Sequence, residues 1–111
     1  MRILYAGSPA PSAKVLDHLA QIKTIEVVGV ITQPDKRRKR RSAEEGSAVA
    51  NVAEKHNLTT LKPHKLDENF KESIKNIEFD VMVVSAYGKI LPNWLLDKAS
   101  IMPVNIHYSL L

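Results

Sequence analysis

The chain alternates short apolar runs with longer amphipathic stretches, and this alternation limits its fold more than any other feature. Five of the short runs have the length of strands, and Glu26 to Thr32 is also rich in β-branched residues. They are Ile3 to Ala6, Glu26 to Thr32, Thr59 to Leu61, Val81 to Ser85 and Met102 to His107. The last run has the composition of a buried strand, except that Asn105 and His107 interrupt it.

Stretches with helical spacing separate these runs. The first begins at Pro11 or Ser12, and the second begins near Ser47. A third has Leu66, Phe70 and Ile74 on one face, and Pro92 opens a fourth. Strands that alternate with helices are typical of βαβ units. The sequence therefore predicts an α/β fold with a Rossmann-like, mostly parallel sheet and flanking helices.

Ligands of such sheets bind beyond the carboxyl ends of the strands. Three segments lie at the carboxyl ends of predicted strands, at residues 7–9, 86–92 and 105–109. The first contains Gly7 alone, where a dinucleotide-binding enzyme would have G-x-G-x-x-G. Pro9 and Pro11 also lack the amide hydrogens that bind a pyrophosphate. We interpret Gly7 as a tight turn, and we do not expect a nicotinamide-dependent enzyme.

The 111 residues are enough for one domain, and they include no cysteine. Disulfides and cysteine-based metal sites are therefore excluded, which favours a reducing, cytoplasmic location. No apolar stretch approaches the ~20 residues that cross a bilayer, and the N-terminus has the pattern of a strand rather than a signal peptide. Because His18, His56 and His64 lack ligand spacing, we expect structural or surface roles for them and no metal site.

The positive charge of the chain is concentrated in one segment, the basic run Lys36 to Arg41, which reads K-R-R-K-R-R. Without these six charges the net charge of +4 would be −2. Clustered Lys and Arg attract phosphates, so the run favours contact with a nucleic-acid backbone. No aromatic residue interrupts it, and base stacking is therefore not indicated. A solvated loop without a partner is the alternative.

Asn105 and His107 have the chemistry of an acyl-transfer site. Side chains alternate along a strand, so these two residues, and Ser109 if the strand continues, share one face at intervals of about 7 Å. An amide can donate a hydrogen bond to an oxygen on which negative charge develops, and an imidazole can move a proton near neutral pH. The alternative is an ordinary strand end with polar side chains in solvent.

The loop A-Y-G-K-I-L-P follows the neighbouring predicted strand. Gly88 permits an unusual backbone conformation there. Ile90 and Leu91 could line an apolar slot for a flat ring whose edge contacts backbone groups. Alternatively, Tyr87, Ile90 and Leu91 only cover the core.

Four segments together resemble one family over residues 1–111: M-R-I-L-Y-A-G-S-P, V-V-G-V-I-T-Q-P-D-K, D-V-M-V-V-S-A-Y-G-K-I-L-P and V-N-I-H-Y-S-L-L. Their order and spacing are similar to those of methionyl-tRNA formyltransferases. The N-x-H-x-S-L-L segment is shared with other 10-formyltetrahydrofolate enzymes, which usually lack T-Q-P-D-K followed by a basic loop. The resemblance implies transfer of a formyl group from 10-formyltetrahydrofolate to the methionine amine of initiator methionyl-tRNA, without a metal or a membrane.

The resemblance also implies roles for individual residues. Asn105 would hold the formyl oxygen and His107 would assist proton movement. Folate would be contacted by Tyr87, Gly88, Lys89, Ile90, Leu91, Ser109, Leu110 and Leu111. The acceptor end of the tRNA would be contacted by Lys36, Arg37, Arg38, Lys39, Arg40 and Arg41.

Two departures from the family pattern qualify these expectations. The basic loop of the family is commonly interrupted as G-R-G, whereas this chain reaches glycine only at Gly46. The family also continues past S-L-L with P-x-x-R-G, further strands, a catalytic Asp and a C-terminal RNA-binding domain. We therefore expect residues 1–111 to be an incomplete N-terminal folate-binding domain of a monomeric enzyme, with little transferase activity alone.

Two other functions stay open. One is a folate-dependent formyltransferase that acts on a small amine, such as glycinamide ribonucleotide. The other is a non-catalytic nucleic-acid-binding module that uses only the basic run.

Overall fold

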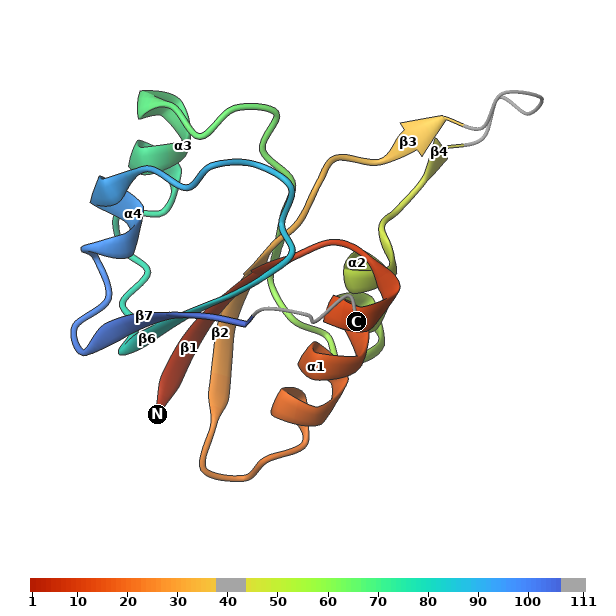
Figure 1. Cartoon of the computed structure of the whole chain (residues 1–111), viewed down its shortest axis with the longest axis horizontal. Coiled ribbons are helices and arrows are strands. Elements are labelled where there is room, and N and C mark those ends of the chain that lie inside the picture. Colours follow the sequence, from red (N-terminus) through yellow and green to blue (C-terminus); the bar gives the residue numbers. More distant parts are fainter. Residues whose placement is uncertain (38–43, 107–111) are drawn as a thin grey trace, which may run out of the picture.

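The computed structural model describes residues 1–37 and 44–106, and its centre is a five-stranded parallel sheet (Figure 1). The strands lie in the order β5-β2-β1-β6-β7. Their bounds are Arg2–Gly7 for β1, Glu26–Ile31 for β2, Thr60–Leu61 for β5, Val81–Ser85 for β6 and Met102–Asn105 for β7. Every neighbouring pair in this sheet is parallel, which confirms the predicted Rossmann-like α/β fold.

Helices cover both faces of the sheet. Helices α1 (Ala10–Ala20) and α2 (Ala48–Lys55) pack on one face, and α3 (Glu68–Ser73) and α4 (Asn93–Leu96) pack on the other (Figure 1). Helix α2 begins after Ser47, as predicted, because the Ser47 hydroxyl accepts a hydrogen bond from the Ala50 amide at 3.0 Å. Two further short strands, β3 (Lys36–Arg37) and β4 (Glu44–Glu45), pair antiparallel and project away from the sheet.

The core consists of two layers, one on each side of β1. Ile3 and Tyr5 pack toward α1 and α2, whereas Leu4 and Ala6 pack toward α3 and α4. This separation follows from the alternation of side chains along a strand. The register of β2 shifts by one residue at Val28, because Ile3 pairs with Val27 and Leu4 pairs with Gly29.

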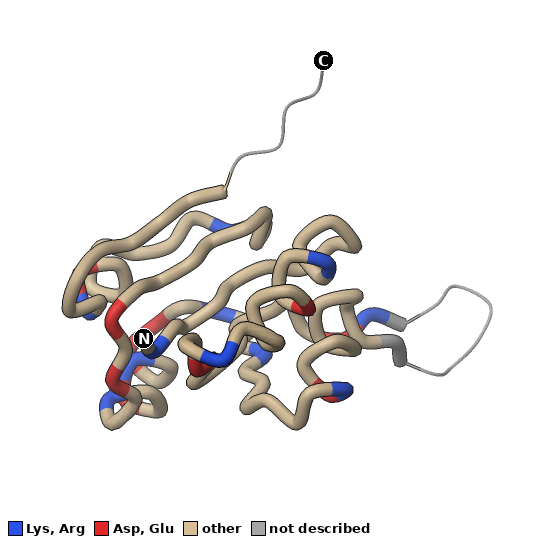
Figure 2. The backbone as a smooth tube through the Cα atoms, turned by 90° about the horizontal axis from the view of Figure 1, so that it is seen from below, with Lys and Arg blue, Asp and Glu red and all other residues tan. Residues whose placement is uncertain are grey.

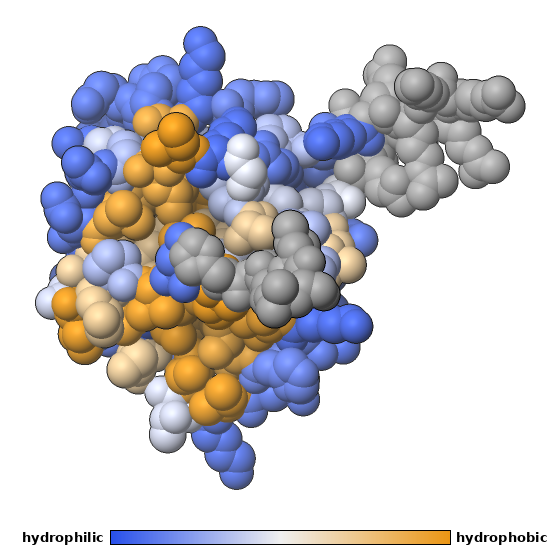
Figure 3. All heavy atoms as spheres, viewed as in Figure 1, coloured by the Kyte–Doolittle hydropathy of each residue, from blue (hydrophilic) through white to orange (hydrophobic). Residues whose placement is uncertain are grey.

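Strand β7 differs from its prediction in two ways. It ends at Asn105, and its four residues are exposed, with 51% exposure for Met102 and 37% for Val104. The expectation of a buried strand was wrong because β6 is its one hydrogen-bonded neighbour within the described chain. Pro103 is tolerated there because an edge strand can lack an amide donor. Figure 3 shows apolar residues gathered across the face that carries β7.

The amino ends of three strands meet at Asp80. Its carboxylate accepts hydrogen bonds from the Arg2 amide at 2.8 Å and from the Ser100 hydroxyl at 3.0 Å. Its backbone carbonyl accepts from the Ile101 amide at 2.8 Å. The Arg2 amide, followed by the Ser100 hydroxyl, lowers the pKa of the Asp80 carboxyl. Asp80 therefore joins the starts of β1, β6 and β7.

Charges of both signs are interspersed along the described chain outside the basic run (Figure 2). Within the described ranges, no helix is long and apolar enough to cross a membrane.

Candidate active site

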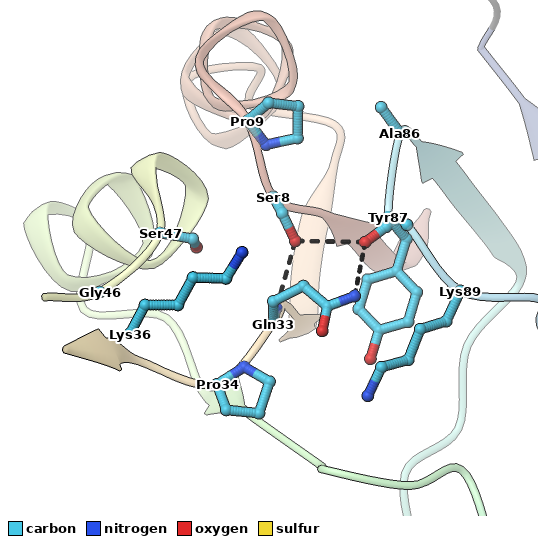
Figure 4. A pocket seen from close by; sticks show the side chains of 11 residues that line it. Ser8, Pro9, Gln33, Pro34, Lys36, Gly46, Ser47, Ala86, Tyr87 and Lys89 are labelled. Carbon is cyan, nitrogen blue, oxygen red and sulfur yellow. Dashed lines mark hydrogen bonds between the residues drawn. The ribbon is translucent and has the colours of Figure 1, made fainter. Parts of the chain in front are cut away.

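The strand order reverses between β1 and β6, and a cavity of about 760 Å³ lies beyond the carboxyl ends of these strands. Open parallel sheets bind ligands at this kind of position, because the loops on the two sides diverge there. Its lining residues come from four segments: Ser8 and Pro9; Gln33, Pro34 and Lys36; Gly46 and Ser47; and Ala86, Tyr87, Gly88 and Lys89 (Figure 4). Two of the three segments predicted at this edge therefore line the same cavity.

Gly7 brings the two central strands together at this edge. A Cβ atom on Gly7 would lie 2.6 Å from the Ser85 carbonyl oxygen and 3.0 Å from the Ser12 Cβ. Gly7 is the last residue of β1 and does not have a positive φ. The interpretation as a tight turn was therefore wrong, and glycine is required because two backbones approach closely.

The turn after β6 has a strained backbone. Ala86 has a φ of 52° and Gly88 has a φ of 96°, so two residues of three lie in the region that favours glycine. The unusual conformation predicted for Gly88 is confirmed. The Tyr87 side chain between them is 2% exposed, and its hydroxyl has no hydrogen-bond partner within the described chain. Burial raises the pKa of this hydroxyl.

A set of hydrogen bonds joins the loops under the cavity. The Gln33 side-chain amide donates to the Tyr87 carbonyl oxygen at 2.9 Å, and the Gln33 backbone amide donates to the Ser8 hydroxyl at 3.2 Å. The Ser8 hydroxyl also lies 3.4 Å from the Tyr87 carbonyl oxygen and 3.3 Å from the Thr32 hydroxyl. The Thr32 hydroxyl in turn contacts that of Ser47 at 2.6 Å. Three strand ends and the start of α2 are thereby held in fixed relative positions.

A second, smaller cavity of about 370 Å³ lies between the loop after β6 and strand β7. Its lining residues are Val84, Lys89, Ile90, Leu91, Leu96, Pro103, Val104 and Asn105. The structure thus brings Asn105 together with the Lys89–Leu91 segment. Ile90 is 95% exposed, so it does not cover the core, whereas Leu91 packs partly against it. Lys89 lines both cavities, and its amine donates to the His64 carbonyl oxygen at 2.6 Å.

The first residue of the basic run, Lys36, lies at the large cavity. Lys36 lines the cavity, and Lys36–Arg37 pair with Glu44–Glu45 as β3 and β4. Just before the run, Asp35 accepts a hydrogen bond from the Lys62 amine at 2.6 Å. Eight of the predicted site residues lie outside the described ranges: Arg38, Lys39, Arg40, Arg41, His107, Ser109, Leu110 and Leu111.

Sequence reasoning did not select Ser8, Gln33 or Ser47 as site residues. The segment Gln33-Pro34-Asp35 lies directly after the predicted strand Glu26 to Thr32 and entered the sequence analysis only within T-Q-P-D-K, a discriminating part of the resemblance. The polar residues that directly follow β1 and β2 were the available signal, because parallel strands place such residues at one edge.

The histidines show no metal site within the described ranges. His56 Nε2 lies 2.6 Å from Asp17 Oδ1 and joins the end of α2 to α1. This contact, followed by that of Lys55, lowers the pKa of the Asp17 carboxyl. His56 therefore has a structural position, formed with a carboxylate that lies 39 residues away in the sequence.

Known proteins similar to this chain are formyltransferases. Residues 1–111 match the family model described as "Formyl transferase". The chain is 37% identical over 111 residues to a methionyl-tRNA formyltransferase of Mycoplasmopsis pulmonis, and it covers 37% of that relative. It is 41% identical over 120 aligned positions to a methionyl-tRNA formyltransferase of Corynebacterium urealyticum, and it covers 36% of that relative. All of this chain is covered in both matches.

A solved structure shares the fold. It is phosphoribosylglycinamide formyltransferase from Anaplasma phagocytophilum, with a TM-score of 0.67 and 18% sequence identity. The match covers 96% of this chain and 49% of that structure. At 18% sequence identity, this similarity shows a shared fold and nothing about the substrate.

Proposed function

The chain belongs to the formyl transferase family, and from this premise we propose that it is the folate-binding part of a methionyl-tRNA formyltransferase. The reaction proposed is transfer of the formyl group of 10-formyltetrahydrofolate to the methionine amine of initiator methionyl-tRNA. Similarity to methionyl-tRNA formyltransferases supports methionyl-tRNA as the acceptor. Because the chain spans 36 to 37% of these relatives, the activity, substrates and partners of the whole protein are part of the proposal. A cytoplasmic, monomeric state belongs to the same proposal.

One observation carries the proposed donor site: Asn105 lines the same small cavity as Lys89, Ile90 and Leu91. Most of the remaining lining is apolar, and the volume of about 370 Å³ lies within the range of small-ligand sites. A flat pterin ring suits such a cavity, since its faces contact apolar side chains and its edge can bind backbone groups. Tyr87 and Gly88, which line the adjoining large cavity, and the Ser109–Leu111 segment complete the proposed folate contacts.

The proposed chemistry follows from the amide and the imidazole. When bound, 10-formyltetrahydrofolate supplies an activated formyl carbon for attack by the amine. The Asn105 side-chain amide would donate a hydrogen bond to the formyl oxygen as negative charge develops on it. His107 would accept the proton that the amine releases and deliver a proton to the folate nitrogen, whose bond to the formyl carbon breaks as the group is transferred. Loss of one such oxyanion donor typically lowers kcat by about 10² to 10³, which sets the expectation for Asn105→Ala measured in the whole protein.

The acceptor is proposed to enter through the large cavity. Lys89 lines both cavities, so an amine in the large cavity would lie close to a formyl group in the small one. Lys36 brings the start of the basic run to the rim of the large cavity. Phosphates near the acceptor end of a tRNA would pair with Lys36 to Arg41.

The donor site is tested by thermal protection with 5-formyltetrahydrofolate. A ligand that binds the folded chain raises its unfolding temperature, whereas p-aminobenzoylglutamate, which lacks the pterin, should protect little. Val104→Trp would fill the small cavity and should abolish protection. Met102→Trp is the matched control, because Met102 is exposed on the same strand outside the cavity and should leave protection unchanged. Equal protection of both variants would refute the donor site.

The acceptor is tested by binding of initiator tRNA at several salt concentrations. Each Lys or Arg that contacts a phosphate should contribute about 1 to the slope of log K against log salt. Changing Lys36 and Arg37 to Gln should reduce the slope by about 2, whereas the same change at the exposed Lys14 and Lys23 should not. An unchanged slope would favour a small-amine formyltransferase. tRNA binding without folate protection would favour a nucleic-acid-binding module.

A further inference from the structure

Gln33 holds the turn after β6 through a closed ring of hydrogen bonds. Its side-chain amide donates to the Tyr87 carbonyl oxygen at 2.9 Å, and its backbone amide donates to the Ser8 hydroxyl at 3.2 Å. The Ser8 hydroxyl donates to the same carbonyl oxygen at 3.4 Å (Figure 4). Gln33 is 25 residues from Ser8 and 54 residues from Tyr87 in the sequence, so the ring fixes three separate loops.

The turn that Gln33 contacts cannot be held by local preference alone. Ala86 has a φ of 52°, which is strained for a residue with a Cβ atom, whereas Gly88 adopts its φ of 96° at little cost. Backbone strain such as that at Ala86 persists only where surrounding contacts impose it. We call the hydrogen bond from Gln33 Nε2 to the Tyr87 carbonyl oxygen the clamp. Gly88 lies directly against it, since a Cβ atom on Gly88 would be 3.2 Å from Gln33 Nε2.

The position of Gln33 joins the two parts of the site. On one side, Pro34 and Asp35 lead from Gln33 into the basic run. On the other, the Tyr87–Gly88 peptide leads into Lys89, Ile90 and Leu91, which line the small cavity. The carbonyl group that Gln33 binds is therefore two residues from the cavity wall.

We propose that Gln33 is a positioning residue that sets the conformation of the Ala86–Gly88 turn and thereby the shape of the small cavity. It acts through the Tyr87 carbonyl group and does not contact the reacting atoms. The identity of the ligand as a folate rests on the proposed function, whereas the clamp itself does not.

Two substitutions separate the hydrogen bond from the packing of the side chain. Gln33→Met keeps the length of the side chain and removes the donor. Gln33→Glu has the shape of glutamine, but its ionised carboxylate has no donor and would face the Tyr87 carbonyl oxygen. Protonation of the carboxylate in this variant would restore an O–H donor. The glutamate variant should therefore recover the hydrogen bond to Tyr87 as the pH falls through the pKa of this carboxyl group, which the facing carbonyl oxygen and partial burial raise above its ordinary value.

The ¹⁵N chemical shift of the Gly88 amide reports whether the hydrogen bond from Gln33 is present. The Gly88 amide and the Tyr87 carbonyl group that Gln33 binds belong to the same peptide unit. We expect the Gly88 signal to move in Gln33→Met at every pH. In Gln33→Glu it should be displaced at pH 7 and return toward the wild-type position at low pH. Affinity for 5-formyltetrahydrofolate should fall about fivefold in the methionine variant, as for the loss of one neutral hydrogen bond, and should recover with the signal in the glutamate variant.

Gln21→Met provides the matched control. The Gln21 side-chain amide also donates to a backbone carbonyl, that of Asp17 at 2.9 Å, but it lies at the end of α1. This variant should leave the Gly88 signal and folate affinity unchanged.

Each outcome decides the proposal. A Gly88 signal that stays in place in both Gln33 variants, or that moves independently of pH in Gln33→Glu, would overturn it. Failure of both variants to fold at every pH would also overturn it, in favour of a purely structural role. If the wild-type chain does not bind the folate, the donor site of the proposed function fails, and the Gly88 signal still decides the clamp.

Discussion

The two ends of the same parallel sheet are held together in different ways. At the amino end, the Asp80 carboxylate binds the Arg2 amide and the Ser100 hydroxyl, so one charged group joins β1, β6 and the segment before β7. At the carboxyl end, neutral groups of Ser8, Gln33 and Tyr87 form a ring beside a cavity of about 760 Å³. Both arrangements join loops that are distant in the sequence.

The difference indicates where the chain can accommodate a ligand. The carboxyl end has two residues with positive φ, Ala86 and Gly88, and a buried Tyr87 hydroxyl without a partner in the described chain. Such unsatisfied or strained groups are costly and concentrate where a ligand is bound. On the amino side, just before β5, Asn57 has a φ of 57°, which asparagine adopts more readily than alanine does. Changes at the amino end should therefore reduce stability without affecting binding, whereas changes at the carboxyl end should affect binding as well.

The largest effect is expected for Gly7→Ala, which would force the carboxyl end open. The new Cβ atom would lie 2.6 Å from the Ser85 carbonyl oxygen, and a backbone atom cannot rotate away. We expect a loss of about 2 to 3 kcal/mol in the free energy of unfolding, measured by denaturant titration. Gly46→Ala is the control, because its nearest neighbours would be 3.4 Å away. Equal stability of the two variants would contradict the close approach of β1 and β6.

A smaller effect is expected for Gly88→Ala, which changes the turn alone. Alanine at a φ of 96° is strained, and its Cβ atom would lie 3.2 Å from Gln33 Nε2. The free energy of unfolding should fall by about 1 to 2 kcal/mol, and protection by 5-formyltetrahydrofolate should weaken. Ala86→Gly, which relieves strain in the same turn, should retain protection. Normal protection of Gly88→Ala would show that the small cavity does not depend on this turn.

The smallest effect at neutral pH is expected for Asp80→Asn, which tests the amino end. The folded-state pKa of Asp80 is lowered below its usual value of 3.8, so its stabilising effect is present above that pH and is lost as the pH falls below it. The unfolding temperature of the variant should be lower than that of the wild type at pH 7, and this difference should shrink below pH ~4. Folate protection should not change.

Glu78→Gln is the control for Asp80→Asn. Glu78 lies 4.0 Å from Arg2, and its side chain is 73% exposed, so its loss should have little effect at any pH. A difference between wild type and Asp80→Asn that persists at low pH would rule out the ionised carboxylate as the source of stability.

Local patterns in the sequence were sufficient for much of the fold. The apolar run Val81–Ser85 coincides with β6, and α2 begins after Ser47, near which a helix was predicted to begin. The unusual conformation of Gly88 was also predictable, because it depends on one residue and its neighbours. These features have short-range causes: side-chain branching, helix capping and the lack of a Cβ atom.

The remaining features depended on which segments are neighbours in space. The requirement for Gly7 arises from the Ser85 carbonyl group, and the exposure of β7 arises from its place at the edge. The contact between Gln33 and Tyr87 joins residues 54 positions apart. The sequence alone therefore determined the five strands of the central sheet, the helices and the residue types at the carboxyl edge of that sheet, but not the short strands β3 and β4. Only the packing of parallel strands decided which of those residues meet, because hydrogen bonds and close contacts act over a few ångströms in space and have no fixed range along the chain.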